Sequence, residues 1–255
     1  MSTTTNNNKV YEFYGTQSPN VSKVRLMFKS LGIDDQVIYH NIDWRKGEQY
    51  SADYVKINPN SKMPAIIDKS DPNDPVTVFE SGNILLYLAD KHKQFIPTSS
   101  FKLRTECLNW VFWQMANLGP IMGQYVHFNH LAEQKCEYSI QRYFNELRRL
   151  LHVLDSHLEG REYVAANMYT IADMCIYPWI ARLPVRVPSL DLQAEFPHLV
   201  KWVKQLKTVQ SVAQWEREDE EARKQSPWVD PSAEERKYMY GRDGREPTTS
   251  TTSLQ

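Results

Sequence analysis

Cysteine is scarce in this sequence, and its placement excludes two classes of protein. Only three of the 255 residues are cysteines, Cys107, Cys136 and Cys175, and no two of them form a C-x-x-C motif. A small disulfide-stapled scaffold and a thiolate zinc finger are therefore excluded. The same scarcity indicates a reducing compartment, so a cytoplasmic location is expected.

Long apolar runs and an excess of one charge are also missing. The longest uninterrupted apolar run is Ile84 to Ala89, whereas a membrane-spanning helix needs about 20 such residues. Lys and Arg number 30 against 31 for Asp and Glu, which gives a formal net charge of −1. Without a basic block, such a chain is a poor candidate for general nucleic-acid binding. Residues 1–9 are polar and carry no apolar segment, so no secretory signal is expected.

What is present is typical of a globular protein of two domains. Hydrophobic residues make up 41% of the chain, which is enough for a packed core. The first third mixes strand and helix periodicity. It predicts, in order, strand, helix, strand, a turn-rich loop, a two-stranded hairpin and a helix, at residues 10–14, 21–31, 36–43, 44–60, 65–68 with 76–79, and 81–92. We expect an α/β domain over residues 9–93.

The rest of the chain is predicted to be helical. Residues 93–103 are expected to form a linker, and residues 103–225 an all-helical domain. Its helix signals lie at 108–115, with a break near Gly119-Pro120, at 138–158, at a capping box formed by Thr170 and Asp173, at Pro197, and at a charged, solvated helix end over 216–224. Residues 226–255 are predicted to form a partly disordered extension, in which the last ten residues are disordered. We expect this extension to drape over the active site.

Four local motifs, in this order and spacing, resemble the cytosolic glutathione transferases. They are Ser18-Pro19-Asn20, residues 58–65, Phe79-Glu80-Ser81-Gly82, and residues 170–173. Residues 110–114, 119–124 and 127–130 resemble more narrowly the nu class of bacterial and fungal proteins, which is similar to the globular part of the yeast nitrogen regulator with prion behaviour. The resemblance spans residues 9 to 215. It implies a thioredoxin-like domain, a helical domain, glutathione as co-substrate and a homodimer.

The resemblance assigns the Met63-Pro64 peptide to the glutathione site. In the family this bond is cis, and the residue before the proline pairs through its backbone with the cysteine part of glutathione. A cis X-Pro bond costs only about 0.5–1 kcal/mol and can turn a backbone N–H and C=O towards a ligand. Taken alone, Pro64 is better interpreted as an ordinary turn proline that opens a strand.

Charged and polar groups are implied at both ends of glutathione. The start of a helix exposes N–H groups with partial positive charge, so Ser81 suits the α-carboxylate of the γ-glutamyl group and Glu80 its ammonium. Lys62 and Gln49 are assigned to the glycine end. Without the resemblance, Ser81 is only a helix cap, and Lys62 and Gln49 are plain surface residues.

The first helix turn carries the predicted chemistry. The nu class places a Thr-Pro-Asn motif near the glutathione sulfur, and here Ser18 replaces the threonine while Asn20 is kept. A donor to a thiolate stabilises its charged form and lowers the thiol pKa. Tyr14 and Ser22 are competing candidates, and Ser18 and Asn20 could simply cap the helix. No cysteine lies at this turn, so a mixed disulfide between enzyme and glutathione is not expected there.

The helical domain contributes one further candidate. In the nu class, the arginine matching Arg142 reaches from one subunit into the glutathione site of its neighbour. The alternative is an ion pair with Glu146 on the same helix, worth about 0.3–0.5 kcal/mol. His127 and His130 lack companions at usable spacing for a metal site, so they are assigned to a pocket wall or the core, and no metal is expected.

Two functions follow from these residues. The first is an enzyme that binds glutathione as a thiolate and reduces a disulfide, with weak conjugation of a small electrophile. The second is a non-catalytic regulatory or binding module of the same fold, as the fungal relative suggests. Asn6, Asn7 and Asn8 are too short a run for a prion-like arm, which favours the enzyme.

Overall fold

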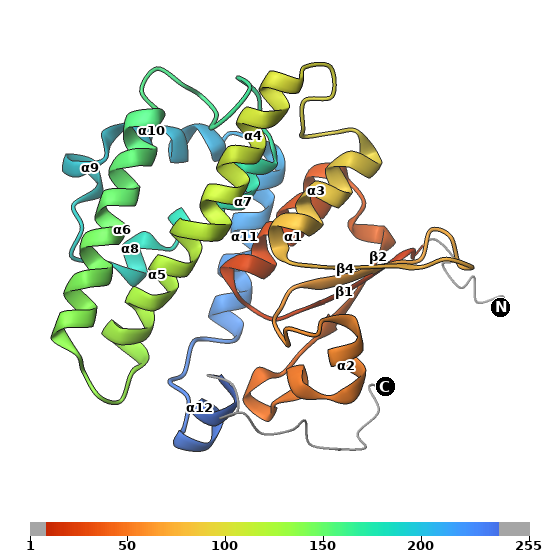
Figure 1. Ribbon diagram of the computed structural model, residues 1–255, viewed down its shortest axis with the longest axis horizontal. Coiled ribbons are helices and arrows are strands. Elements are labelled where there is room, and N and C mark those ends of the chain that lie inside the picture. Colours follow the sequence, from red (N-terminus) through yellow and green to blue (C-terminus); the bar gives the residue numbers. More distant parts are fainter. Residues whose placement is uncertain (1–8, 240–255) are drawn as a thin grey trace. The chain divides into compact units, whose positions relative to one another are not determined.

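A computed structural model describes residues 9–239, and they divide into two compact units (Figure 1). The first contains the described residues up to Tyr87 together with those from Arg223 onward, and the second spans Leu88–Ala222. The C-terminal extension therefore packs with the N-terminal unit as far as it is described. Its residues 240–255, on which the prediction of disorder falls, lie outside the described residues, as do Asn6, Asn7 and Asn8.

The first unit is built on a mixed four-stranded sheet of order β2-β1-β3-β4. Strand β1 (Tyr11–Gly15) is parallel to β2 (Val37–Asn41) and antiparallel to β3 (Ala65–Asp68), which pairs antiparallel with β4 (Val76–Phe79). The predicted hairpin is confirmed, with both strands at their predicted residues. Helices α1 (Pro19–Leu31) and α3 (starting at Ser81 and ending at His92) lie on one face of the sheet, and α2 (Ala52–Ile57) lies on the other (Figure 1). This is the predicted thioredoxin-like arrangement.

Aromatic side chains fill both faces of this sheet. Phe13 and Tyr11 each lie 5.6 Å, between ring centroids, from Phe28 of α1. On the opposite face, Tyr14 and Tyr54 join a small buried cluster. Burying a large apolar side chain contributes about 1.5–3 kcal/mol, so these rings fix the two layers on the strands and hold the loops at the strand ends in place.

The second unit is helical, as predicted. Its elements are α4 (Phe101–Trp113), η4 (Gln114–Leu118), α5 (Gly119–Val126), η5 (His127–Leu131), α6 (Glu137–His157), α7 (Ile171–Ile180), α8 (Leu183–Arg186), α9 (Leu192–Glu195), α10 (Pro197–Leu206) and α11 (Gln210–Gln225), except for the end of α11 from Arg223 onward, which belongs to the first unit. The capping box is confirmed, because Thr170 and Asp173 bond to each other's backbone at the start of α7. The predicted linker ends at Ser100, whose side chain caps α4.

The predicted break near Gly119-Pro120 is wrong. The chain stays helical there, because a π-helical turn, η4, bridges α4 and α5 and the backbone N–H of Gly119 bonds to the Gln114 carbonyl, five residues back. This wider turn places Pro120 in the first turn of α5, where its missing N–H is tolerated.

The charged stretch of α11 is not solvated on every side, contrary to the prediction. Glu216 accepts a 2.7 Å hydrogen bond from the Tyr177 hydroxyl and lies 3.3 Å from the Lys207 ammonium. Asp219 pairs with Arg182, and both side chains are largely buried. These acidic groups therefore hold α11 against its neighbours in the second unit.

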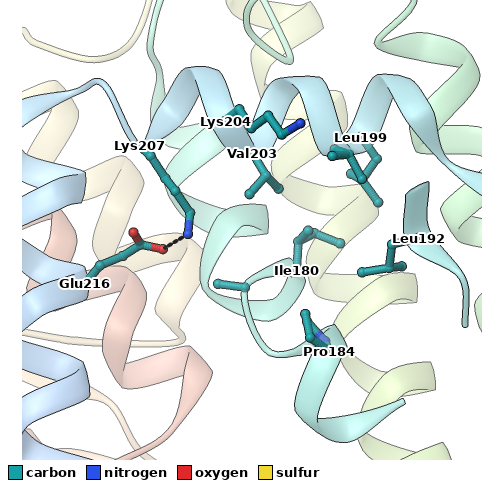
Figure 2. A pocket seen from close by; sticks show the side chains of 10 residues that line it. Ile180, Pro184, Leu192, Leu199, Val203, Lys204, Lys207 and Glu216 are labelled. Atoms are coloured by element: carbon teal, nitrogen blue, oxygen red, sulfur yellow. Dashed lines mark ion pairs between the residues drawn. The ribbon is translucent and has the colours of Figure 1, made fainter. Parts of the chain in front are cut away.

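A cavity of about 320 Å³ opens beside this charged stretch (Figure 2). Its walls are mostly apolar side chains of α7, α9 and α10, with the ion pair of Lys207 and Glu216 at one side. None of the residues predicted to bind glutathione lines it. Among residues 9–239, no helix combines the length and apolarity that crossing a bilayer requires.

Candidate functional site

One edge of the sheet in the first unit brings most of the predicted site residues together. Register pairs Tyr14 of β1 with Ala65 of β3, and Ala65 with Phe79 of β4. The carboxyl ends of β1 and β4 therefore meet the amino end of β3 at this edge. The segments attached there are the start of α1, the Met63-Pro64 loop and the start of α3, which carry the predicted residues Ser18, Asn20, Lys62, Met63, Pro64, Glu80 and Ser81.

The start of α1 presents polar groups at a helix N-terminus. The Ser18 side chain caps the helix by accepting a 3.3 Å hydrogen bond from the Val21 N–H, and Pro19 occupies the first helical position. Asn20 follows in the first turn, and Ser18 and Asn20 are both half-buried. A capping hydroxyl keeps its own proton to donate, so capping and thiolate stabilisation are compatible for Ser18.

Tyr14 is a poor competitor for the thiol. Its hydroxyl donates a 2.6 Å hydrogen bond to Glu12, and the ring is buried. Burial, together with the nearby Glu12 carboxylate, raises the pKa of the Tyr14 hydroxyl well above its usual range. Its proton is thus engaged by Glu12 and is not available to a thiolate. The other competitor, Ser22, is buried one turn into α1.

The loop before β3 presents an open stretch of backbone. The Met63-Pro64 peptide bond is cis, as predicted. The carbonyl of Lys62 accepts hydrogen bonds from the Tyr54 hydroxyl, at 2.7 Å, and from the Asn58 amide, at 2.6 Å. Neither the N–H nor the C=O of Met63 bonds to another described residue. Two side chains thus fix the loop, and Met63 keeps an amide and a carbonyl for an extended peptide ligand.

The start of α3 combines backbone strain with a buried hydroxyl. Glu80 is exposed and has φ = +69°, a left-handed conformation that is unfavourable for a residue with a side chain. Ser81 is 2% exposed, and its Oγ accepts a 3.2 Å hydrogen bond from the ammonium of Lys23. Sequence patterns did not single out Lys23, because a lysine beside the apolar stripe of a helix usually lies in solvent.

Lys62 and Gln49 lie in contrasting surroundings. Lys62 is exposed, and its ammonium bonds to no other described residue. Gln49, in the short helix η3 (Glu48–Tyr50), is only 4% exposed, and its Nε2 donates a 3.0 Å hydrogen bond to the carbonyl of Tyr238. The structure therefore encloses Gln49 beneath the C-terminal segment.

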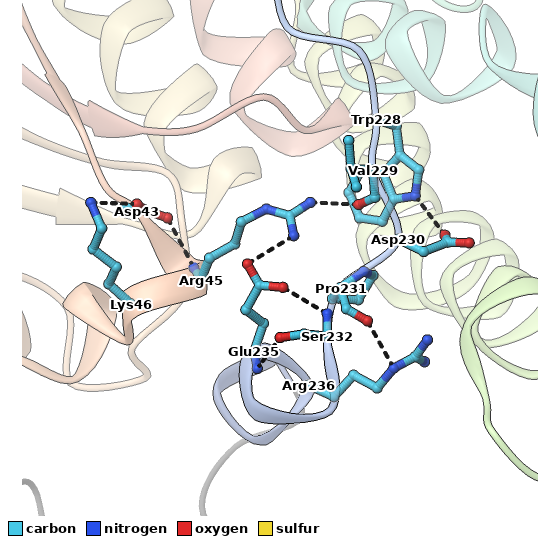
Figure 3. Close-up of polar contacts among 10 residues, drawn as sticks. All are labelled: Asp43, Arg45, Lys46, Trp228, Val229, Asp230, Pro231, Ser232, Glu235 and Arg236. Carbon is cyan, nitrogen blue, oxygen red and sulfur yellow. Dashed lines mark hydrogen bonds and ion pairs between the residues drawn. The ribbon is translucent and has the colours of Figure 1, made fainter.

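That segment is anchored to the neighbouring turn η2 (Trp44–Lys46) (Figure 3). Arg45 donates 2.6 Å and 3.1 Å hydrogen bonds to the Val229 carbonyl and to the Glu235 carboxylate. The Trp44 and Trp228 rings stack at 6.1 Å between centroids. Helix α12 (Ala233–Met239) follows, and one of its carbonyls accepts from Gln49.

Arg142 belongs to the second unit. It is exposed on α6, and it makes no hydrogen bond or ion pair with another described residue. Glu146, its predicted alternative partner, bonds to Arg149 at 2.7 and 2.9 Å instead. Arg142 therefore makes no direct ion pair with Glu146, although its charge helps to lower the pKa of that carboxyl. The role at a subunit interface stays a prediction.

The three cysteines, together with His127 and His130, lie in the second unit. Burial raises the pKa of Cys107 to about 11, and the Cys175 thiol donates to the buried Gln114 side chain. Cys136 is exposed beside Ser139.

His130 contacts the carbonyl of Arg186 at 2.9 Å. In the portion of the chain that the structure describes, no three His, Cys, Asp or Glu side chains gather as metal ligands.

Comparison with known proteins identifies the family. The glutathione S-transferase N-terminal domain matches residues 17–91, and the glutathione S-transferase C-terminal domain matches residues 118–208. A glutathione S-transferase domain-containing protein of Dictyostelium discoideum is 39% identical over 204 residues, 77% of each chain. The chain therefore belongs to the glutathione S-transferase family.

Two bacterial proteins and Ure2p show which members of this family the chain resembles. The disulfide-bond oxidoreductase YfcG of Escherichia coli is 37% identical over 77% of this chain and 90% of its own. A glutathione transferase family member from Pseudomonas fluorescens, solved with two glutathione bound, has a TM-score of 0.75 and 34% identity, covering 82% of this chain and 93% of its own. Ure2p in complex with glutathione is 27% identical at a TM-score of 0.74, over 82% of this chain and 95% of its own. The predicted resemblance is confirmed.

Proposed function

We propose that this protein is a cytoplasmic, glutathione-dependent disulfide reductase with weaker glutathione conjugation activity. One observation carries the proposal: a single sheet edge holds two helix N-termini and the unpaired backbone of Met63. A tripeptide with two carboxylates and a thiol matches such a site, because helix N-termini favour anions and an open backbone edge pairs with a peptide.

Each part of glutathione has a proposed partner at this edge. The α-carboxylate of the γ-glutamyl group binds the Ser81 amide and hydroxyl, and Glu80 pairs with its ammonium. The cysteine backbone pairs with Met63 before Pro64. The glycine carboxylate lies near Lys62, and Gln49 contacts the same end. The positions of these residues support the proposed roles. For Gln49, the C-terminal segment that covers it must first move away.

Ser18 and Asn20 are proposed to stabilise the glutathione thiolate. Lowering a thiol pKa from about 8.5 to about 6.5 takes roughly 2.7 kcal/mol of differential stabilisation. One charge-assisted hydrogen bond supplies about 1.5–3 kcal/mol, and a helix N-terminus adds about 0.3–1 kcal/mol. The half-buried groups at the start of α1 can therefore supply the stabilisation that this lowering of the thiol pKa requires.

The proposed reaction is thiol–disulfide exchange between two glutathiones and a disulfide substrate. The first thiolate attacks one substrate sulfur, which forms a mixed disulfide and releases the other sulfur as a thiolate that takes up a proton. A second glutathione thiolate attacks the glutathione sulfur of the mixed disulfide, which yields glutathione disulfide and the second substrate thiol. Two glutathiones are oxidised as one disulfide is reduced, and no enzyme cysteine takes part.

The relatives support this reaction over conjugation. Two Escherichia coli relatives are named disulfide-bond oxidoreductases. A Pseudomonas putida neighbour, 32% identical at a TM-score of 0.75, was solved with one glutathione disulfide bound per subunit. A site of this kind holds both glutathione halves of the disulfide that the proposed exchange produces.

The alternative function is a binding module without turnover, which the Ure2p likeness favours. One experiment separates the two. The protein is retained on immobilised glutathione and then assayed for reduction of a small disulfide by glutathione. Retention with turnover supports the reductase, whereas retention without turnover favours the binding module.

We also propose a homodimer in which Arg142 serves the neighbouring subunit. Arg142 is exposed and makes no hydrogen bond or close ion pair with a described residue, although its charge acts on the nearby Glu146. Helices α4 and α6 also expose large apolar side chains, such as Phe112 at 63% and Tyr138 at 80%. A second subunit that covered these side chains would remove apolar surface from water, which favours association.

Arg142→Ala is expected to weaken glutathione binding about threefold to tenfold in the dimer and not in the dilute monomer, because only a second subunit brings the guanidinium to the ligand. Titration calorimetry at concentrations above and below dimer dissociation measures this difference. Arg149→Ala on the same helix is the control and should leave affinity unchanged. Equal affinity of Arg142→Ala and the parent at both concentrations would rule out a cross-subunit role.

A further inference from the structure

Lys23 is a charged group in the first unit that the proposed reaction leaves unused. It lies on α1, one turn beyond the Ser18 cap, and its side chain is completely buried. Among the described residues it is the one lysine or arginine in the buried set. Burial of an ammonium is costly unless it is compensated, so a fully buried lysine calls for a structural or functional reason.

The contact of Lys23 with Ser81 points to that reason. Its ammonium donates a 3.2 Å hydrogen bond to Ser81 Oγ, joining α1 to the first residue of α3. An ammonium only donates, so Ser81 Oγ is the acceptor and its own proton must point away from Lys23. A hydroxyl that accepts from a cation is also a stronger donor, because hydrogen bonds in a chain polarise one another.

We propose that Lys23 is a positioning residue for anion binding at the start of α3. It fixes the Ser81 hydroxyl with its proton directed to the α-carboxylate of the γ-glutamyl group. It also places a positive charge close to that carboxylate, with only the Ser81 hydroxyl between the two groups. This role rests on the proposed function, because it acts on glutathione through Ser81.

Lys23→Met tests this role, because methionine keeps most of the buried volume without the charge. Glutathione binding should weaken about tenfold, while binding of cysteinylglycine, which lacks the γ-glutamyl group, should change less than twofold. The KM for glutathione should rise and kcat should stay within twofold, because the group is remote from the sulfur. Lys56→Met, which removes an exposed lysine from the same unit, is the matched control.

A double-mutant cycle with Ser81→Ala separates positioning from general damage. The double variant should bind glutathione no more weakly than the weaker single variant. Unchanged glutathione affinity in Lys23→Met, equal losses for glutathione and cysteinylglycine, or fully additive losses in the cycle would overturn the proposal. If the parent itself fails to bind glutathione, the proposed function fails instead.

The C-terminal segment carries a second, independent inference. Residues 228–239 cover the turns that carry Gln49. The carbonyl of Tyr238 accepts a hydrogen bond from the side-chain amide of Gln49. The Tyr238 ring also lies against Gly47, where an added Cβ would come within 2.7 Å of it. The Oε1 atom of Gln49 is buried and has no hydrogen-bond partner among the described residues. In this arrangement Gln49 is inaccessible to a ligand.

We infer that residues 228–239 are a latch that competes with glutathione for Gln49. Binding at the glycine end then requires the latch to leave the turn. The apparent affinity is reduced by the fraction of molecules in which Gln49 is covered. By linkage, glutathione binding loosens the latch to the same extent. This inference also rests on the proposed function.

Arg45→Met tests the latch, because Arg45 bonds to both Val229 and Glu235. The variant should bind glutathione about fivefold more tightly in titration calorimetry. Lys46→Met is the control, since Lys46 is exposed, pairs with Asp43 and not with the C-terminal segment, and should leave affinity within twofold. In the parent, saturating glutathione should increase amide hydrogen exchange over residues 228–239.

Three results would overturn the latch. They are unchanged or weaker glutathione binding by Arg45→Met, exchange over residues 228–239 that stays constant or falls with glutathione, and an equal gain in affinity when Gln49→Ala is already present. Absence of glutathione binding in both the parent and Arg45→Met would instead contradict the proposed function.

Discussion

Asn20→Ala is expected to lower the rate of glutathione-dependent disulfide reduction about 10- to 100-fold, the effect of losing one charge-assisted hydrogen bond to the thiolate. Asn20 lies in the first turn of α1 at the sheet edge that carries the cis peptide. Its amide can donate to a sulfur there, and the rate depends on the thiolate fraction of bound glutathione. Steady-state assays near pH 7 with a small disulfide measure the loss.

The stability of the variant separates chemistry from folding. Ser18, rather than Asn20, caps α1, so the melting temperature of Asn20→Ala should stay close to that of the parent. Ser18→Ala should instead cost about 1 kcal/mol of stability in addition to its effect on rate. Asn73→Ala, in the exposed turn of the hairpin, is the control. An unchanged rate in Asn20→Ala would remove Asn20 from the mechanism.

Asp173→Ala is expected to destabilise the helical unit by about 3–5 kcal/mol, because it removes a buried carboxylate that accepts several hydrogen bonds. One oxygen of Asp173 accepts from the Val164 N–H at 2.9 Å and from Trp202 Nε1 at 3.0 Å. The other accepts from the N–H and the hydroxyl of Thr170. Burial raises the pKa of Asp173 to about 6, and all four donors oppose that shift.

Urea unfolding followed by circular dichroism measures this loss. The exposed Asp53→Ala is the control and should change the free energy of unfolding by less than about 0.5 kcal/mol. A loss below about 1 kcal/mol in Asp173→Ala would show that the capping box and its links to Val164 and Trp202 contribute little. Asp173 is thus a folding residue, consistent with its place in the capping box of α7.

Local patterns in the sequence were sufficient for most of the fold. The turn at residues 71–75 sets the hairpin, and the apolar stripe and Gly32 set the extent of α1. Local patterns failed where a contact between distant residues, or an unusual helical turn, determines the structure. Pro120 predicts a break in the helix. The π-helical turn η4 instead places Pro120 in the first turn of α5, where its missing N–H is tolerated. The charged stretch of α11 predicts solvation, yet Tyr177 and Arg182 bind its carboxylates.

The candidate site shows the same division. The motifs around Ser18, Met63 and Glu80 could be recognised because each is short and contiguous. Lys23 could not, because its contact with Ser81 joins residues 58 positions apart. The C-terminal extension was expected over the active site, but its contact with Gln49 was not, since Tyr238 lies 189 positions away and no local pattern links the two.

The pKa of the glutathione thiol bound to the protein tests the central claim most directly. Ultraviolet difference spectra of the thiolate, recorded across pH with saturating glutathione, give this value. The account predicts an apparent pKa near about 6.5, roughly two units below that of a free thiol. A bound thiol that titrates near about 8.5, or a titration showing no saturable binding of glutathione, would contradict it.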